Sequence, residues 1–111
     1  MDNYSEMLKG ILEGYVLEIL RKEQTYGYEI LRRLRSLGFS EIAEGTVYAL
    51  LLRLEREKLL TIVKKPSVIG PPRKFYSLNQ KGQKELAAFR ERWAFLVNTM
   101  ADLRTRDNPS I

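Results

Sequence analysis

Hydrophobic residues recur at helical spacing in three segments of the first half of the chain. Residues 5–22 carry apolar side chains at i, i+3 and i+4 spacings, which form one broad stripe typical of a largely buried helix. Residues 27–37 repeat the pattern over a shorter length and precede Gly38, a residue typical of helix C-caps. Residues 45–57 form the third segment. The pattern therefore predicts three consecutive helices.

The second and third helices each have an apolar side that we expect to pack inward. In the second helix this side consists of Ile30, Leu31, Leu34 and Leu37. In the third helix it consists of Val47, Leu50, Leu51 and Leu54. The opposite side of the third helix is small near its N-terminus and basic further on, with Gly45, Thr46, Ala49, Arg53 and Arg56, and with Tyr48 and Leu52 at the edges. We expect this second side to face outward.

After the third helix the pattern changes from helical to strand-like. Residues 59–63 are apolar and rich in β-branched side chains, and residues 74–78 are rich in aromatic side chains, so both segments favour strands. Residues 64–73 contain three prolines and Gly70, which predict a hairpin loop. Asn79 is a suitable N-cap for a last helix from about residue 80 to residue 103.

This order of elements is typical of a winged helix-turn-helix, a mainly α fold with a small β-hairpin, here with a long C-terminal helix added. In that fold the third helix enters the DNA major groove, and the hairpin is the wing. We expect residues 1–79 to form the DNA-binding domain, residues 80–104 a dimerisation helix and residues 105–111 a frayed tail.

Composition narrows the classes of function. The chain of 111 residues is 44% hydrophobic and 30% charged, which suits one globular domain. It has no cysteine and no histidine, so we expect no metal, no cofactor and no enzyme activity. The longest uncharged stretch, residues 93–101, is far shorter than the roughly 20 residues that span a bilayer. No basic segment followed by an apolar run opens the chain, so we expect no signal peptide and a cytoplasmic protein without membrane contact.

The positive charge is concentrated in one part of the chain. The net charge is +5, yet residues 58–84 contain seven basic side chains and no acidic one. A one-sided basic segment favours a polyanionic partner such as double-stranded DNA. A solvated lysine-rich surface is the alternative, and charge alone does not separate the two.

The residue types on the third helix and the wing fit DNA recognition. The small Gly45, Thr46 and Ala49 allow close approach of the helix to base edges, and Arg53 and Tyr48 are candidates for base or phosphate contacts. On the wing the candidates are Lys64, Lys65, Arg73 and Lys74, which flank the proline-rich loop.

Each candidate also has a structural interpretation. Thr46 is a common helix-start residue, and Tyr48 is suited to packing. Arg53 can pair with Glu57 on a solvated face, and Lys64 and Lys65 can protect a sheet edge against aggregation. The DNA-binding interpretation gains weight because all these residues fall on two elements that a winged helix presents to one duplex.

The last helix has an unbroken a/d heptad seam. It consists of Leu86, Phe89, Trp93, Leu96, Met100 and Leu103. We expect this seam to form a homodimer interface, with Leu8, Ile11 and Leu12 of the first helix on its other side. Packing within one monomer is the alternative. Trp93, with Phe89 and Tyr15, is also a candidate wall for a small aromatic effector, although a tryptophan is more often a core anchor.

Several segments together resemble the PadR family of transcriptional regulators. They are residues 26–30 (YGYEI), residues 45–48 (GTVY) with Leu51 and residues 53–55 (RLE), residues 70–78 (GPPRKFYSL), and residues 81–82 (KG). The resemblance covers about residues 8–100. It implies a winged-helix repressor that is dimeric through its first and last helices and released from operator DNA by a small molecule. It also implies DNA contacts by Tyr26 or Tyr28, Thr46, Tyr48, and Arg73 with Lys74.

Three residues depart from the family pattern as we know it. Ala49 stands where proline is usual, Lys58 where glycine is usual in the turn after the third helix, and Asn79 where threonine is usual. With one terminal helix the chain resembles the short members of the family. In drug-responsive short members an aromatic residue of the last helix lines a cavity between subunits, and Trp93 is similarly placed.

The scattered acidic residues and the missing histidine disfavour an enzyme. Two other classes of function stay open. The first is a ligand-responsive repressor whose two third helices lie roughly 34 Å apart on DNA, a spacing that a ligand near Trp93 changes. The second is a winged-helix module for protein–protein contact without specific DNA binding.

Overall fold

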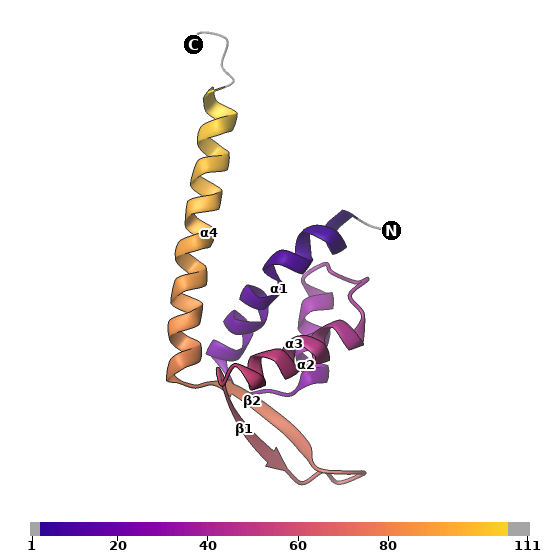
Figure 1. Ribbon diagram of the computed structural model, residues 1–111. Coiled ribbons are helices and arrows are strands. Elements are labelled where there is room, and N and C mark those ends of the chain that lie inside the picture. Colours follow the sequence, from indigo (N-terminus) through magenta and orange to yellow (C-terminus); the bar gives the residue numbers. More distant parts are fainter. Residues whose placement is uncertain (1–2, 107–111) are drawn as a thin grey trace.

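The computed structural model describes residues 3–106, with side chains described from residue 7 onward. Its elements are α1 (Asn3–Lys22), α2 (Gly27–Ser36), α3 (Glu44–Arg56), β1 (Leu60–Lys65), β2 (Arg73–Leu78) and α4 (Gln80–Arg106). Figure 1 shows α1, α2 and α3 gathered into one body, from which the hairpin and α4 project in different directions. The predicted fold, mainly helical with one antiparallel hairpin, is confirmed.

The core of the body is built from the apolar sides of α1, α2 and α3. Val16, Ile30, Val47 and Leu54 have no exposed surface at all. All four inward positions predicted for α3 are buried, as are the first three predicted for α2. The expectation for Leu37 is wrong, because it is 60% exposed. The α2 helix ends at Ser36 and Leu37 is its C-cap residue. The helical spacing that predicts an inward side chain therefore does not extend to Leu37.

The hairpin is tied to the start of α2. Strands β1 and β2 pair antiparallel from Leu60 opposite Leu78 to Lys65 opposite Arg73, so the connecting loop is shorter than the sequence predicts and comprises residues 66–72. Thr25, just before α2, exchanges two backbone hydrogen bonds with Tyr76, of 3.0 and 2.7 Å. These bonds fix the wing relative to the helix-turn-helix.

A tight turn at Lys58 and the N-cap of α4 are joined by one side chain. Lys58 has φ of +62°, the left-handed conformation that favours glycine. The Asn79 amide donates to the Lys58 carbonyl at 2.8 Å, and its Oδ1 accepts from the Gly82 backbone N–H at 2.8 Å. The predicted cap is therefore confirmed, and the same side chain also stabilises the strained turn.

The α4 helix packs on the body only at its base. Leu86 is buried, whereas every residue from 91 to 106 is exposed. The helix continues to Arg106, three residues beyond the predicted end, so Thr105 and Arg106 of the predicted frayed tail are helical. The rest of that tail, residues 107–111, lies outside the described residues. No helix within residues 3–106 is both long and apolar enough to cross a bilayer.

Candidate nucleic-acid interface

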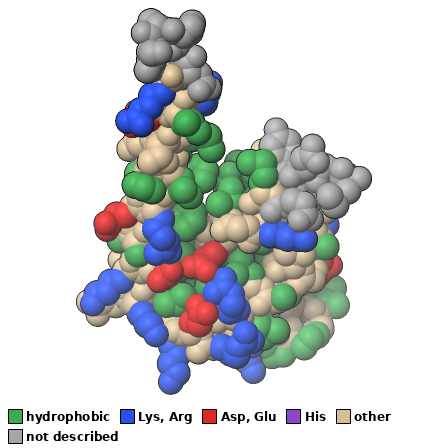
Figure 2. All heavy atoms as spheres, turned by 45° about the horizontal axis from the view of Figure 1, so that its top comes forward, with side chains coloured by type: hydrophobic (Ala, Val, Ile, Leu, Met, Phe, Trp, Pro, Cys, Tyr) green, Lys and Arg blue, Asp and Glu red, His purple; other side chains and the backbone are tan. Residues whose placement is uncertain are grey.

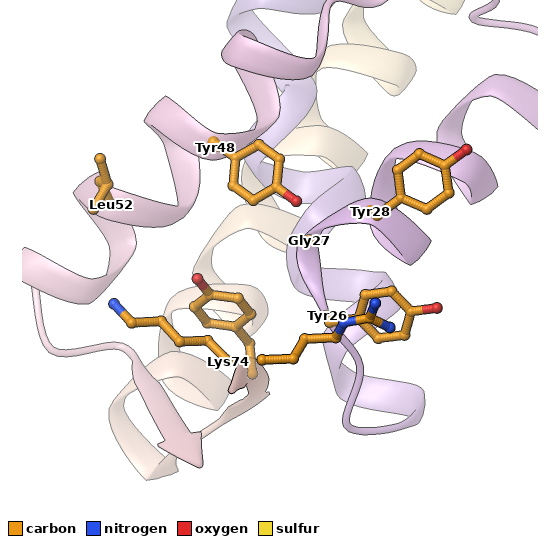
Figure 3. Close-up of a pocket in the computed structure, with 8 residues that line it drawn as sticks. Tyr26, Gly27, Tyr28, Tyr48, Leu52 and Lys74 are labelled. Atoms are coloured by element: carbon orange, nitrogen blue, oxygen red, sulfur yellow. The ribbon is translucent and has the colours of Figure 1, made fainter. Parts of the chain in front are cut away.

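A hollow on the surface brings together residues from α2, α3 and the wing (Figure 3). Its walls are Tyr26, Gly27 and Tyr28 from the start of α2, Tyr48 and Leu52 from α3, and Arg73, Lys74 and Tyr76 from β2. Five of these residues were predicted to bind DNA. The fold thus converts candidates that are far apart in the sequence into one continuous surface, which we call the tyrosine face.

Tyr48 lies across the first residue of α2. A Cβ at Gly27 would come within 2.5 Å of the Tyr48 ring, so only glycine allows this position of the ring. Partial burial, and then the nearby Glu44 carboxylate, raise the pKa of the Tyr48 phenol. A tyrosine phenol is a hydrogen-bond donor at neutral pH, so Tyr48 can donate its hydroxyl to a phosphate oxygen.

Arg73 is held by an aromatic ring. Its guanidinium lies 4.3 Å from the centroid of Tyr26, which in turn packs edge-on against Phe75 at 5.3 Å. Lys65 lies 4.5 Å from the Phe75 ring on the same face of the hairpin. Among the described side chains, residues 7–106, no carboxylate forms an ion pair with Arg73. Its N–H donors are oriented by stacking and stay available for an anion.

Like charges stand directly opposite one another at the outer end of the hairpin. Lys64 pairs with Lys74, and Lys65 pairs with Arg73. Two opposed like-charge pairs destabilise an isolated hairpin. One carboxylate offsets part of this repulsion, because Glu55 lies 3.5 Å from the Lys74 ammonium. The arrangement is suited to a polyanion that neutralises all four cations.

The small residues of α3 face outward, as predicted. Gly45, Thr46 and Ala49 are exposed, and the last two border a shallow hollow that also includes Arg56. The helix begins at Glu44, and its N-cap Ala43 makes no side-chain cap bond. The interpretation of Thr46 as the helix-start residue is therefore not supported.

The DNA contact of Arg53 stays a prediction, and in this structure the side chain pairs within its own chain. Its guanidinium donates to Glu13 of α1 at 2.6 Å and to Glu57 at 3.1 Å. These two carboxylates take up donors that a base or phosphate would need. The alternative, a pair with Glu57, describes Arg53 better, and the Glu13 contact makes the residue a link between α1 and α3.

Three members of the tyrosine face, Gly27, Leu52 and the buried Tyr76, were not among the predicted contacts. Gly27 is needed for the position of Tyr48, and Leu52 presents an exposed aliphatic side chain beside it. For Gly27 the sequence gives a signal, because this glycine stands between two tyrosines. Leu52 was placed only at the edge of the outward side, and its neighbours in the fold could not be read from helical periodicity.

The predicted dimerisation residues fall into three groups, of which the smallest is Ile11 and Phe89, both partly buried in the hollow between α1 and α4. Leu8 and Leu12 are 5% exposed and Leu86 is 2% exposed, so these three belong to the core of one copy and their assignment to an interface is wrong. The reason is that the base of α4 packs on α1 of its own chain. The outer part of the seam is exposed and has no cover from residues 7–106; it consists of Trp93, Leu96, Met100 and Leu103.

The three predicted effector contacts share one hollow between α1 and α4. It has a volume of about 240 Å³ and includes Tyr15, Phe89 and Trp93, with Glu18 and Arg90 at its polar end. The Phe89 and Trp93 rings are stacked 6.4 Å apart at an interplanar angle of 8°. Figure 2 shows hydrophobic side chains on both sides of the space between α4 and the body.

The chain is similar to known proteins over most of its length. Residues 16–88 match the model of the transcriptional regulator PadR-like family. A PadR-like transcriptional regulator from Bacillus cereus is 42% identical, with 88% of this chain and 95% of that chain covered and a TM-score of 0.78. A Streptococcus transcriptional regulator is 37% identical, with 88% and 96% covered and a TM-score of 0.79.

A third structure is that of Bacillus subtilis PadR in complex with operator DNA. It is 27% identical, with 71% of this chain and 46% of that chain covered and a TM-score of 0.65. The family consists of transcriptional regulators, in agreement with the expectation that the chain is not an enzyme. The match covers well over half of the sequence and the fold agrees throughout the winged helix. The chain therefore belongs to the PadR-like family of transcriptional regulators.

Proposed function

We propose that this protein is a dimeric repressor that binds operator DNA through α3 and the hairpin. The observation that carries the proposal is the two opposed like-charge pairs, Lys64 with Lys74 and Lys65 with Arg73, whose β2 members also line the tyrosine face. Phosphates would neutralise these cations and accept from the protonated Tyr48 hydroxyl. The fold shared with Bacillus subtilis PadR, which is described in complex with operator DNA, supports the same conclusion.

The small outward residues of α3 complete the interface. Gly45, Thr46 and Ala49 let the helix backbone come close to base edges in the major groove, while Tyr26, Tyr28 and the wing cations hold the flanking phosphates. A second copy, joined through the exposed seam of α4, would place two α3 helices roughly 34 Å apart, which is one turn of DNA. As a regulator of transcription the dimer would work in the cytoplasm.

An aromatic effector is assigned to the hollow at Trp93. A flat ring there would lie against the stacked Phe89 and Trp93, at the joint between α1 and α4. The effector releases the operator only if it binds the non-operator geometry of the dimer more tightly than the operator geometry. Trp93 is the only tryptophan, so quenching of its emission reports ligand binding directly.

The decisive experiment is fluorescence anisotropy of labelled DNA from upstream of the gene for this protein, against scrambled DNA, over a salt series. Specific binding would favour the upstream DNA and weaken steeply with salt. Arg73→Gln should reduce the slope of log affinity against log salt by about 1. Lys84→Gln is the matched control, because Lys84 is an exposed cation on α4 outside the tyrosine face, and it should leave the slope unchanged.

Three results would contradict parts of the proposal. Equal, salt-insensitive binding to both duplexes would favour a winged helix that contacts a protein partner instead. Specific binding together with increased transcription of a reporter behind the upstream DNA would identify the protein as an activator and not a repressor. Release of DNA by an aromatic ligand that is unchanged in Trp93→Ala would place the effector elsewhere.

A further inference from the structure

The tip of the wing presents two adjacent aliphatic side chains to solvent. Val68 is fully exposed and Ile69 is 88% exposed. They lie in the loop of residues 66–72, at the end of the hairpin that projects furthest from the helical body (Figure 1). Single exposed aliphatic residues are common on proteins. A pair of them at the outermost point of an otherwise basic hairpin needs a partner that has both apolar and anionic surface.

The tip is held in this conformation before any partner arrives. Pro66, Pro71 and Pro72 restrict the backbone on both sides, and Gly70 supplies a positive φ of 92°. The Ser67 hydroxyl donates to the Ile69 carbonyl at 2.6 Å. Ordering Val68 and Ile69 against a partner therefore costs little conformational entropy.

The cations behind the tip indicate which partner has that combination of surfaces. Lys64, Lys65, Arg73 and Lys74 form the neck of the hairpin, immediately behind the aliphatic pair. A DNA minor groove has rows of phosphates at its two rims, and aliphatic side chains of minor-groove proteins insert between its stacked base pairs. The neck of the hairpin matches the rims, and the aliphatic tip matches a side-chain pair that inserts between base pairs. The same duplex is already in contact with the neighbouring tyrosine face in the proposed function.

We propose that Val68 and Ile69 form an apolar wedge that enters the minor groove beside the segment contacted by α3. A wedge of this kind partly unstacks a base step and bends the duplex. The cost is lowest at flexible pyrimidine–purine steps, so the wedge gives this regulator a preference for flanking sequence that no hydrogen bond to a base provides. This inference rests on the proposed DNA binding and adds to it a second, shape-dependent specificity site.

The test uses the intact chain and a random-sequence duplex library. Duplexes are selected from the library with wild type and, separately, with the double variant Val68→Ser with Ile69→Ser. The affinity for the duplex that wild type enriches most, and the bend of that duplex, are then measured with both proteins. Both side chains are exposed, so the substitutions remove no packing. Leu37→Ser, which also removes an exposed aliphatic side chain but from the far end of α2, is the matched control.

We expect the double variant to lose about tenfold in affinity for the winning duplex with an unchanged salt slope, since no charge is removed. It should also bend the duplex less and lose the preference at flanking positions while retaining the preference under α3. Leu37→Ser should match wild type in all four measurements.

The outcomes that overturn the inference are distinct from failure of the proposed function. If wild type enriches a sequence and the double variant binds, bends and selects in the same way, the wedge is wrong and operator binding stands. If wild type enriches nothing, both proposals fall. If the double variant keeps its DNA behaviour but loses binding to vesicles of anionic lipid, the tip contacts membranes instead.

Discussion

The body of the molecule and the outer part of α4 use the same aliphatic and aromatic residue types to opposite effect. In the body, side chains such as Val16, Ile30 and Leu54 are fully buried by their own chain. On α4 beyond residue 90 every side chain is exposed, and the large apolar ones are Trp93, Phe95, Leu96, Val97, Met100 and Leu103. The first region covers its own hydrophobic surface, whereas the second leaves its hydrophobic surface uncovered by the described part of the chain.

This difference separates two kinds of stability in one chain. The free energy of unfolding of the body is set by packing within a single copy. The outer part of α4 projects without support, and isolated helices shorter than about 15 residues are marginal in water. An apolar stripe of this extent on a monomer marks an interface. We therefore expect changes in the body to affect folding and changes in outer α4 to affect assembly.

The largest effect should come from the body. Leu34 has no exposed surface, so Leu34→Ala should lower the free energy of unfolding by about 2–5 kcal/mol through lost burial and a cavity. Leu37→Ala, three residues along and exposed, should change it by less than about 0.5 kcal/mol. Urea unfolding followed by circular dichroism measures both at one protein concentration. Similar losses in the two variants would show that the body is not packed as described.

The second largest effect should be on dimerisation. Leu96→Lys with Met100→Lys places two charges on the exposed seam and should weaken dimerisation by at least about a hundredfold, because buried unpaired charges are costly. Asn98→Lys with Thr105→Lys adds the same charge at exposed polar positions outside the seam and should leave the dimer intact. Sedimentation equilibrium distinguishes the two double variants. A dimer that survives the first pair would mean that outer α4 is not the interface.

A smaller effect should arise where the two regions meet. A Cβ at Gly14 would overlap the Phe89 ring, so Gly14→Ala should destabilise the junction of α1 and α4 by about 1–3 kcal/mol. Gly10 lies on the same helix with open space around it, so Gly10→Ala should stabilise by about 0.5–1 kcal/mol through helix propensity. Thermal unfolding gives the two signs. Stabilisation by both substitutions would disprove the tight contact at Phe89.

The smallest effect should come from the ion pair between the regions. Arg90 donates to both oxygens of Glu18 at 2.7 and 2.8 Å, and these hydrogen bonds lower the pKa of the Glu18 carboxyl below its ordinary 4.5. Both side chains are well exposed, so Arg90→Gln should lower the free energy of unfolding only slightly at neutral pH.

The pH dependence of this pair has a definite sign. A lowered carboxyl pKa stabilises the folded state above pH 4.5, and the stabilisation disappears as the pH falls through the folded-state pKa. The difference between wild type and Arg90→Gln should therefore vanish on acidification. Arg92→Gln, which removes only the 3.3 Å contact with Glu85 within α4, is the control. A difference that persists in acid would assign the role of Arg90 to packing.

Local features of the fold followed from the sequence, whereas pairings between distant segments did not. The inward positions of α3 and the Asn79 cap depend on neighbours within a few residues, and both were predicted. The Arg53 contact with Glu13 joins residues 40 positions apart, and periodicity within one helix contains no information about it. The same limitation explains why Leu86, read as part of a seam, proved to be core.

Two departures from the family pattern turn out to be connected. The sequence placed Lys58 where glycine is usual and Asn79 where threonine is usual, as separate observations. In the fold the positive φ of Lys58 explains why glycine is suited to that turn. The Asn79 amide donates to the Lys58 carbonyl while its oxygen caps α4, and a threonine hydroxyl provides no amide donor for the first of these bonds.

The length of α4 has a consequence for how finely the dimer can be adjusted. A helix of 27 residues is about 40 Å long, so a small rotation of α4 where it leaves the body displaces its far end by a larger distance. A rotation of about 5° at that point moves the far end by about 3.5 Å, close to the rise of about one base pair in DNA. A ligand bound at the proposed site, beside Phe89 and Trp93, would therefore act near the base of this helix, where a small displacement produces a larger one at the far end.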